Sequence, residues 1–267
     1  MAPRISRVSA AASPRQLEGR SPVSLLLCAA TGPELAGLVP GFAPECFSAS
    51  APKSWPEMAL WPLRLKCAAL CCITGVGPVN AAMAMGIALS RAKAEGTPIT
   101  AVLNAGLAGA FDLAQRPLLA LCHVRKEIWP EYGLHDGRSV TAQAFGFPQW
   151  QPPDGPAVRD RIPLAGLEVL AQFGARHGDD VFLPSTSLTV AGVSASFARA
   201  ADLRASYGAD LENMEGFAVA YASAREGVPC VGVRSVSNKV GPRASDEKDF
   251  PGALAALTRV LPALNLI

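Results

Sequence analysis

Apolar runs alternate with glycine turns and helical segments along the chain, and this alternation predicts an α/β fold. Strand, turn and helix in repeated succession are typical of a largely parallel sheet with helices on both faces. We therefore expect a three-layer sandwich around a mostly parallel central sheet. The predicted strands are 24–30, 63–73, 98–104, 180–190 and 228–233, with 117–128 as a further candidate, and the predicted helices are a short one after Thr31 and then 79–93, 164–175, 194–205, 217–224 and 247–261.

The stretch 209–243 combines a predicted helix, a predicted strand and a group of polar residues. Asn213 is suited to cap the helix, and Gly227 is suited to end it. The apolar residues 228–233 predict a strand that is buried on both faces. Ligands of open α/β sheets bind beyond the carboxyl ends of the strands. We therefore expect a pocket faced by the polar residues that follow this strand, which are Arg234, Ser237, Asn238 and Lys239.

Two glycine turns and one irregular segment are further candidate pocket elements. The turns are 75–77 and 104–109, and each follows a predicted strand. Segment 131–161 is rich in Gly, Pro and aromatic residues and shows little periodicity. It predicts an irregular excursion over the sheet, and loops of this kind shape ligand pockets.

Composition predicts one globular domain whose overall charge is too small to favour nucleic acid or a membrane as partner. The chain has 267 residues, of which 50% are hydrophobic, so it is long enough to bury one large core. Its 24 basic and 22 acidic residues give a net charge of +2, which favours neither nucleic acid nor a membrane surface. Residues 1–21 are polar and predict a loose N-terminal tail, so we expect the single domain to span 22–267.

Cysteine and histidine spacing predicts neither disulfides nor a metal site. The seven cysteines are scattered without a Cys-x-x-Cys pair, which is typical of buried free thiols in a reducing cytoplasm. His123, His135 and His177 share no metal-like spacing. The window 67–90 lacks charge and has the length of a membrane span. Its middle, 74–80, predicts a strand-to-helix turn instead, so we expect no membrane segment.

Two motifs in the stretch 209–243 resemble a known superfamily. They are Met214-Glu215 opening an Ala-rich helix, and Val233-Arg-Ser-Val-Ser-Asn238 following Val228-Pro229. The pair resembles the purine nucleosidase and phosphorylase superfamily. Within it the motifs are most similar to futalosine hydrolases, nucleosidases of the alternative menaquinone pathway, and next to methylthioadenosine/S-adenosylhomocysteine nucleosidases. The resemblance runs with gaps from Val23 to about the C-terminus.

The resemblance implies a phosphorylase/hydrolase-like fold, a nucleoside substrate, no cofactor and a homo-oligomer of at least two chains. It also implies roles for particular residues. Glu34 would activate water, and Glu215 would accept hydrogen bonds from the ribose 2′ and 3′ hydroxyls. The other implied substrate contacts are Met214 against the sugar and Gly77 in the first glycine turn. Apart from the resemblance, Phe145, Phe147 and Trp150 of the irregular segment are candidates to wall off the base or the 5′ substituent, and simple packing explains aromatic residues in a loop equally well. Arg234 and Ser237 would support the water and Glu34.

Asn238 stands where the adenine-specific nucleosidases carry an aspartate. Hypoxanthine presents two acceptors on the edge concerned, O6 and N7, whereas adenine presents an amino donor beside N7. An asparagine amide can donate to both acceptors, while an ionised carboxylate would repel O6. Asn238 therefore favours a 6-oxopurine. Together with this preference, the resemblance to futalosine hydrolases implies that the products are hypoxanthine and dehypoxanthine futalosine. Without the resemblance, an asparagine that caps a turn at a strand end explains the residue equally well.

Several alternatives remain open from the sequence. A methylthioadenosine nucleosidase and a purine nucleoside phosphorylase are the rival enzymes, and a non-catalytic nucleoside-binding protein is the rival of another class. Phosphorylases of the superfamily place Arg and then Ser or Thr where this chain has Asn104 and Leu107, which favours water over phosphate as nucleophile. The cation expected beside the carboxylate of futalosine is not decided among Arg125, Lys126, Lys239 and Arg243.

Overall fold

The computed structural model describes residues 24–42, 59–137, 139–178, 180–242, 244 and 247–267, so the predicted tail 1–21 and Arg243 lie outside the described residues. The elements are β1 (Ser24–Ala29), α1 (Gly32–Leu38), β2 (Trp61–Arg64), β3 (Ala68–Ile73), α2 (Pro78–Ala94), β4 (Ile99–Ala110), β5 (Leu121–Ile128), β6 (Leu134–His135), β7 (Val140–Thr141), β8 (Arg161–Pro163), the 3₁₀ helix η2 (Leu167–Phe173), β9 (Leu183–Thr189), α3 (Phe197–Tyr207), β10 (Leu211–Asn213), α4 (Gly216–Arg225), β11 (Cys230–Lys239), α5 (Phe250–Leu257) and α6 (Val260–Ala263).

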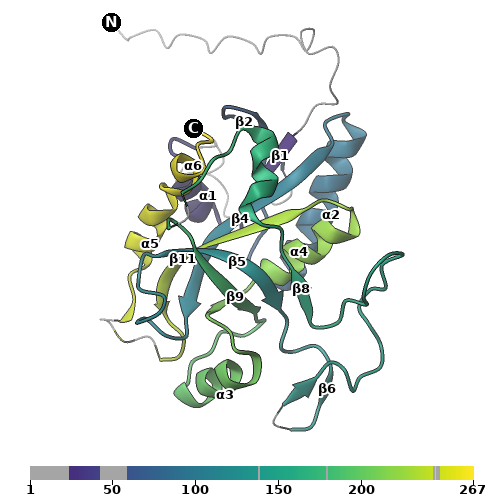
Figure 1. The fold of residues 1–267 in the computed structure, drawn as a ribbon, viewed down its shortest axis with the longest axis vertical. Coiled ribbons are helices and arrows are strands. Elements are labelled where there is room, and N and C mark those ends of the chain that lie inside the picture. Colours follow the sequence, from purple (N-terminus) through teal and green to yellow (C-terminus); the bar gives the residue numbers. More distant parts are fainter. Residues whose placement is uncertain (1–23, 43–58, 138, 179, 243, 245–246) are drawn as a thin grey trace, which may run out of the picture.

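The main sheet has mixed strand directions. Its strands lie in the order β10-β9-β5-β11-β4-β1-β3-β2, and β8 pairs with β5. Among the described strands, five pairings are parallel and four are antiparallel. Because β10 pairs with both β9 and β4, the strands β4, β11, β5, β9 and β10 form a closed ring of pairings. Long strands β4 and β11 run parallel at the centre of the molecule (Figure 1).

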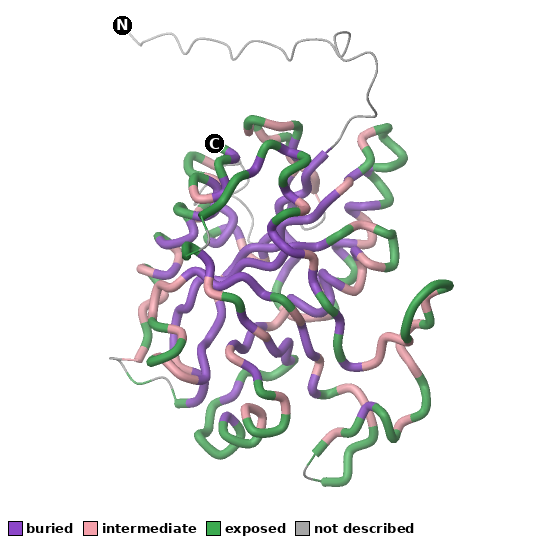
Figure 2. Tube along the Cα trace, viewed as in Figure 1, coloured by how far each residue is buried: buried purple, intermediate pink, exposed green. Residues whose placement is uncertain are grey.

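Helices cover both faces of the sheet. Successive side chains of a strand point to opposite faces, and β1 shows this division. Leu25 and Leu27 pack in a cluster with residues of α1, η2, α5 and α6. Leu26 and Cys28 pack in a second cluster with residues of α2 and α4. The buried backbone follows the sheet through the centre, and exposed residues lie on the outer helices and loops (Figure 2).

The structure corrects the predicted ends of two strands. The glycine-rich stretch 104–109 is not a turn, because β4 continues through it to Ala110, and neither Gly106 nor Gly109 adopts a positive φ. Likewise β11 does not end near residue 233 but runs to Lys239. The small residues of β4 and the polar residues of β11 therefore lie side by side in register, with Arg234 opposite Gly106 and Asn238 opposite Gly109.

Other elements also differ from their predicted form. The predicted strand 63–73 is an antiparallel pair, β2 and β3, joined at residues 65–67. The predicted helix 164–175 is a shorter 3₁₀ helix that Gly174 ends in the left-handed conformation. The closing helix is divided into α5 and α6, which meet at Thr258 and Arg259. Among the described residues no helix is both long and apolar enough to cross a membrane.

The excursion 131–161 packs against α4 through aromatic rings. Trp129 contacts Phe217, and Trp150 contacts Tyr221 edge-on. The guanidinium of Arg225 lies 5.4 Å from the centre of the Trp150 ring. The Tyr221 hydroxyl donates to the backbone oxygen of Gln149. These contacts fix one side of α4, the helix that the Met-Glu motif immediately precedes.

A fully buried carboxyl group lies beneath the start of α4. Glu127 of β5 accepts hydrogen bonds from the Thr189 hydroxyl and the Asn213 amide. Burial raises the pKa of the Glu127 carboxyl from 4.5 to about 7, although the neighbouring Arg234 and these two hydrogen bonds lower it. The folded protein therefore holds a proton there at pH values where the unfolded chain has released it.

This buried group predicts a pH-dependent loss of stability. The folded state binds more protons than the unfolded state between about pH 4.5 and pH 7, so stability falls as pH rises through this window. The full loss is about 3 kcal/mol above pH 7. Glu127→Gln cannot titrate, so the difference in unfolding free energy between wild type and variant should change by about this amount across the window. Urea unfolding at several pH values measures it, with exposed Glu95→Gln as the control. Parallel wild-type and variant curves would contradict the assignment.

Candidate active site

Glu34 is a buried carboxylate held by donors from two elements. Thr31 caps α1 and forms a capping box with Glu34, and both the backbone N–H and the hydroxyl of Thr31 donate to Glu34 Oε2, at 2.9 and 2.7 Å. Glu34 Oε1 accepts from the Leu107 N–H of β4 at 2.9 Å. A Cβ on Gly106 would lie 2.8 Å from that oxygen, so the glycine is what lets the carboxylate approach the strand.

Glu215 is the second carboxylate of the site. It is the N-cap residue of α4, and its Oε1 accepts from the Gly77 N–H at 2.8 Å. Gly77 begins α2 with φ +91°, a conformation that favours glycine. Burial raises the pKa of Glu215, and the charge of Glu34 raises it further, whereas the Gly77 N–H and Arg234 lower it. Glu34 and Glu215 therefore lie close enough to interact.

Arg234 supplies the buried positive charge beneath these carboxylates. Its side chain is almost fully buried, and Nη1 donates to the backbone oxygens of Asn104 and Val233, both at 3.0 Å. Its charge acts on Glu127 and on Glu215. The expected support of Glu34 by Arg234 is not among the contacts of the described residues, where Arg234 instead acts on these two other carboxyl groups.

Asn238 lies near the end of β11. It is buried, and its Nδ2 donates to the backbone oxygen of Lys239 at 2.7 Å. The Ser237 hydroxyl lies 2.9 Å from Asn238 Oδ1 and 3.2 Å from the Ala108 oxygen, so Ser237 orients Asn238 rather than Glu34. A Cβ on Gly109 would lie 3.0 Å from Asn238 Nδ2. The two glycines of β4 thus leave room for Glu34 and for Asn238, and the glycines themselves are three strand residues, or about 10 Å, apart along β4.

The other residues that the sequence predicts to contact the sugar, the base or the 5′ substituent are partly buried or exposed. Met214 is half-buried beside Glu215. Phe145 and Phe147 contact each other, and Phe145 also contacts Tyr132; Phe147 is exposed.

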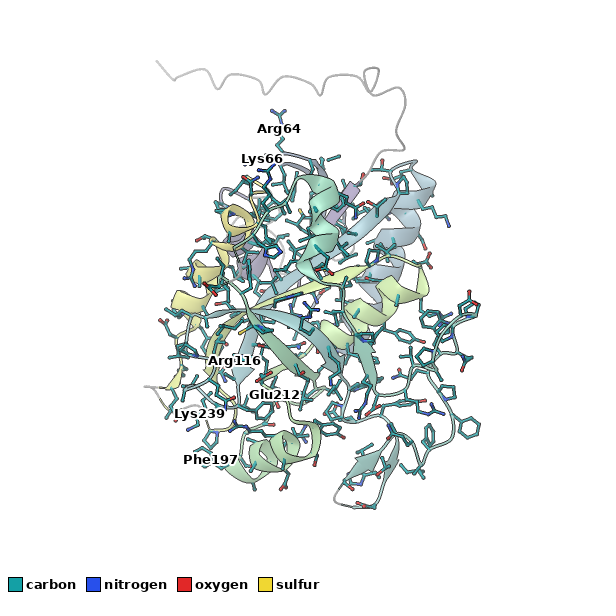
Figure 3. The ribbon with its side chains drawn as sticks, in the orientation of Figure 1. Arg64, Lys66, Arg116, Phe197, Glu212 and Lys239 are labelled. Atoms are coloured by element: carbon teal, nitrogen blue, oxygen red, sulfur yellow. The ribbon has the colours of Figure 1, made fainter. Side chains whose placement is uncertain are left out.

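Lys239 forms an ion pair with Glu247 and lies over the ring of Phe197, the first residue of α3 (Figure 3). Of the other candidate cations, Arg125 is exposed and Lys126 is half-buried.

The sequence reading missed several residues that position the site. Glu212 precedes the Met-Glu motif, and its two oxygens accept from the N–H and the hydroxyl of Ser194, which fixes the loop after β9. Glu127 and Thr189 hold the start of α4 from below. Their signal in the sequence is weak, because single polar residues in β5 and β9 are common. The glycines of β4 predict a turn from sequence alone, because the side chains that need their space, Glu34 and Asn238, are distant in the sequence.

The arrangement can perform acid-base chemistry on a small polar ligand. It offers one carboxylate oriented by three donors, a second carboxylate with a raised pKa, and a buried amide beyond them. No cluster of three or more His, Cys, Asp or Glu residues in the described part of the chain is arranged to hold a metal ion.

Comparisons with known proteins identify the family of the chain. A family model described as the phosphorylase superfamily matches residues 64–264. The chain is 39% identical to the futalosine hydrolase of Streptomyces coelicolor over 188 residues, which are 69% of this chain and 73% of that protein. It is 33% identical to the futalosine hydrolase of Thermus thermophilus over 198 residues, 72% of this chain and 78% of that protein.

Solved structures show the same fold. The futalosine hydrolase of Helicobacter pylori superposes with a TM-score of 0.64 at 18% identity, covering 91% of this chain and 97% of that one. A methylthioadenosine/S-adenosylhomocysteine nucleosidase from S. pneumoniae gives a TM-score of 0.66 at 18% identity, covering 91% and 98%. Since the family model spans most of the chain and two relatives exceed 30% identity over more than two thirds of their length, the chain belongs to the phosphorylase superfamily and, within it, to the futalosine hydrolases.

Proposed function

We propose that this chain hydrolyses the N-glycosidic bond of futalosine, releasing hypoxanthine and dehypoxanthine futalosine, a step of menaquinone biosynthesis. The chain is thus an N-glycosyl hydrolase. The observation that carries the choice of base is Asn238, a buried amide with one N–H bonded to the backbone oxygen of Lys239. Its second N–H is proposed to face the base. That N–H can donate to an acceptor on the edge of a 6-oxopurine.

In the proposed mechanism Glu34 activates the nucleophilic water. The water oxygen forms a bond to C1′ while Glu34 takes a proton from the water. The C1′–N9 bond breaks through an oxocarbenium-like transition state, and its electron pair leaves with the base. Thr31 and the Leu107 N–H fix the direction of the carboxylate. Asn238 stabilises the charge that develops on the departing hypoxanthine.

Glu215 is proposed to hold the ribose. Gly77 occupies one of its oxygens, and the other can accept from the 2′ and 3′ hydroxyls. Met214 would pack on the sugar, and Phe145 and Phe147 would border the base or the 5′ substituent. Ser237 supports Asn238, and Arg234 offsets the charge of the ribose-binding carboxylate.

The organisation of the molecule is proposed as follows. Residues 22–267 form one nucleosidase domain, a three-layer sandwich, as supported by the two apolar clusters on opposite faces of the sheet. The enzyme acts in the cytoplasm, in keeping with its six described free cysteines. It assembles as a homo-oligomer, as supported by the exposed apolar residues Val76, Val79 and Met83 beside Gly77.

The overall test is to incubate the purified protein with futalosine, inosine and methylthioadenosine, with and without phosphate, and to identify the released base. Hypoxanthine should appear from futalosine without phosphate. Phosphate-dependent release would indicate a phosphorylase, release of adenine from methylthioadenosine alone would indicate that nucleosidase, and binding without turnover would indicate a nucleoside-binding protein.

Glu34→Gln should lower turnover by about a hundredfold or more while nucleoside binding is largely retained, because the amide keeps the shape of the carboxylate but cannot take the proton. Steady-state kinetics and isothermal titration calorimetry measure the two effects, and Glu95→Gln is a matched control on an exposed helix end. Near-normal turnover in a correctly folded variant would refute the role of Glu34.

Glu215→Ala should weaken binding and slow cleavage together, because hydrogen bonds from ribose to a carboxylate are each worth about 1.5 to 3 kcal/mol and strengthen as the sugar becomes cationic. A 2′-deoxy substrate already lacks part of this contact, so the variant should discriminate less than wild type between ribo and 2′-deoxy substrates. Equal discrimination in both proteins would show that Glu215 does not hold that hydroxyl.

Asn238→Asp should move base preference from hypoxanthine towards adenine. An ionised carboxylate accepts from the adenine amino group but repels O6, and a site with unpaired buried polar groups rejects the wrong base strongly. Competition between matched 6-oxo and 6-amino nucleosides, read as the ratio of the two released bases, measures the change. Asn265→Asp, remote from the site beside Lys66, is the control. A wild type that already prefers adenine, or an unmoved ratio, would exclude Asn238 as the base-reading residue.

A further inference from the structure

Glu215 does not cap its own helix with its side chain. It occupies the N-cap position of α4, but its carboxylate is directed to the Gly77 N–H. The first N–H groups of a helix need other acceptors. Asn213 Oδ1 accepts from the N–H groups of Glu215 and Gly216, at 2.9 and 2.7 Å, and Thr189 Oγ1 accepts from the Phe217 N–H at 2.7 Å. Two side chains thus satisfy three consecutive N–H groups and fix the backbone that carries Glu215.

Glu127 orients both of these side chains. Asn213 Nδ2 donates to Glu127 Oε1 at 2.9 Å and to the Ser187 hydroxyl at 2.6 Å, which leaves Oδ1 facing the helix. The Thr189 hydroxyl donates its proton to Glu127 Oε2 at 2.9 Å, so its lone pairs face the Phe217 N–H. Each hydrogen bond to the Glu127 carboxylate turns an oxygen of the partner side chain, Asn213 or Thr189, towards α4. These oxygens are the acceptors that the first N–H groups of the helix require.

The close approach of Glu127 to the helix requires Gly216. A Cβ at this position would lie 1.9 Å from Glu127 Oε1 and 2.4 Å from its Cδ. The backbone of Gly216 is not in the left-handed region, so alanine is excluded there by this carboxylate and by the Asn213 amide, 3.0 Å away, rather than by its own torsion angles. Position 216, which follows Met-Glu, must therefore be glycine as long as position 127 is a glutamate.

The charged and titratable groups facing Glu127 come from β11 and α4. Arg234 of β11 attracts its carboxylate, Glu215 repels it, and the thiol of Cys230 also lies within range of its charge. A change in the charge of Glu127 therefore reaches Glu215 in two ways: directly through space, and through the hydrogen bonds to Asn213 and Thr189.

We propose that Glu127 is a positioning residue for ribose recognition: through Asn213 and Thr189 it fixes the first turn of α4 and so places the Glu215 carboxylate on the sugar hydroxyls, with Gly216 making room for it. This rests on the proposed role of Glu215. It follows that loss of the Glu127 carboxylate weakens discrimination by the 2′ hydroxyl, even though Glu127 lies beneath the helix and touches no part of the sugar.

The experiment compares kcat/KM for futalosine and for its 2′-deoxy analogue, and takes the ratio of the two. Glu127→Ala should lower the wild-type ratio by about tenfold, the lower end of what a charge-assisted hydrogen bond supplies. Glu127→Gln should give an intermediate ratio, because its amide oxygen still accepts from Asn213. Glu215→Ala should abolish most of the discrimination, and Glu127→Ala should add little to it in the double variant.

Gly216→Ala tests the same contact from the helix side. It should lower the ratio in the wild-type background, and it should have little further effect in Glu127→Ala, where the carboxyl group no longer fills the space. Gly216→Ala in the wild-type background also provides an independent test of the contact if Glu127→Ala does not fold. Asp210→Asn is the control for a general loss of stability, since Asp210 holds the Thr186 N–H and Arg116 at the opposite end of β10. It should lower the melting temperature and leave the ratio unchanged.

A second readout is the pH profile of the ratio. In wild type it should change as pH passes about 7, where Glu127 changes charge, and in Glu127→Gln this change should be absent. If Glu215→Ala abolishes discrimination while the Glu127 and Gly216 variants keep the wild-type ratio, the positioning role is wrong and the role of Glu215 stands. If Glu215→Ala itself keeps the ratio, both the proposed role of Glu215 and the inference built on it are overturned.

Discussion

The Glu34 carboxylate lies against the backbone of β4 because residue 106 has no side chain, and the geometry of the site depends on this close approach. The same strand lacks a side chain at Gly109, beneath Asn238. A strand this deep in the sheet is rigid, since it pairs with β1, β11 and β10. Glu34 of α1 and Asn238 of β11 thus both pack against β4, at two glycines whose spacing along the strand is fixed. A fixed spacing of this kind favours holding a nucleoside in a reactive geometry.

Burial of like charges is the electrostatic consequence of this arrangement. Glu34 and Glu215 interact unfavourably, and Glu127 lies beneath them, so three carboxyl groups share one region. Arg234 offsets part of this charge, and its Nη1 donates to the backbone oxygens of Asn104 and Val233. Such a cluster costs stability, and its members are stabilised mainly by hydrogen bonds from backbone, amide and hydroxyl groups. A ribose that becomes cationic in the transition state would relieve the same repulsion, so the charge cluster favours the transition state over the empty site.

The sequence predicted the elements better than their ends. Buried strands such as β1 and β11 were visible as apolar runs, and the Met-Glu helix was visible from Asn213 and Gly227. The continuation of β4 through 104–109 was not, because glycine signals a turn unless a neighbouring side chain needs its space, and that neighbour, Glu34, is far away in sequence. The same limit applies to Glu127. Its role depends on Asn213 and Thr189, which only the pairing of β5, β9 and β10 brings together.

The preference for water over phosphate also follows from the extended β4. Asn104, at the position where phosphorylases of the superfamily carry arginine, lies inside this strand with a buried side chain. Its neutral amide supplies no charge to offset a phosphate dianion. Arg234 donates Nη1 to the Asn104 and Val233 oxygens, and its positive charge interacts with two carboxyl groups, Glu127 and Glu215, which offset it. An anionic nucleophile would have to enter beside Glu34 and Glu215 without a free cation among these residues. Water enters without that electrostatic cost, and in the proposed mechanism Glu34 takes its proton.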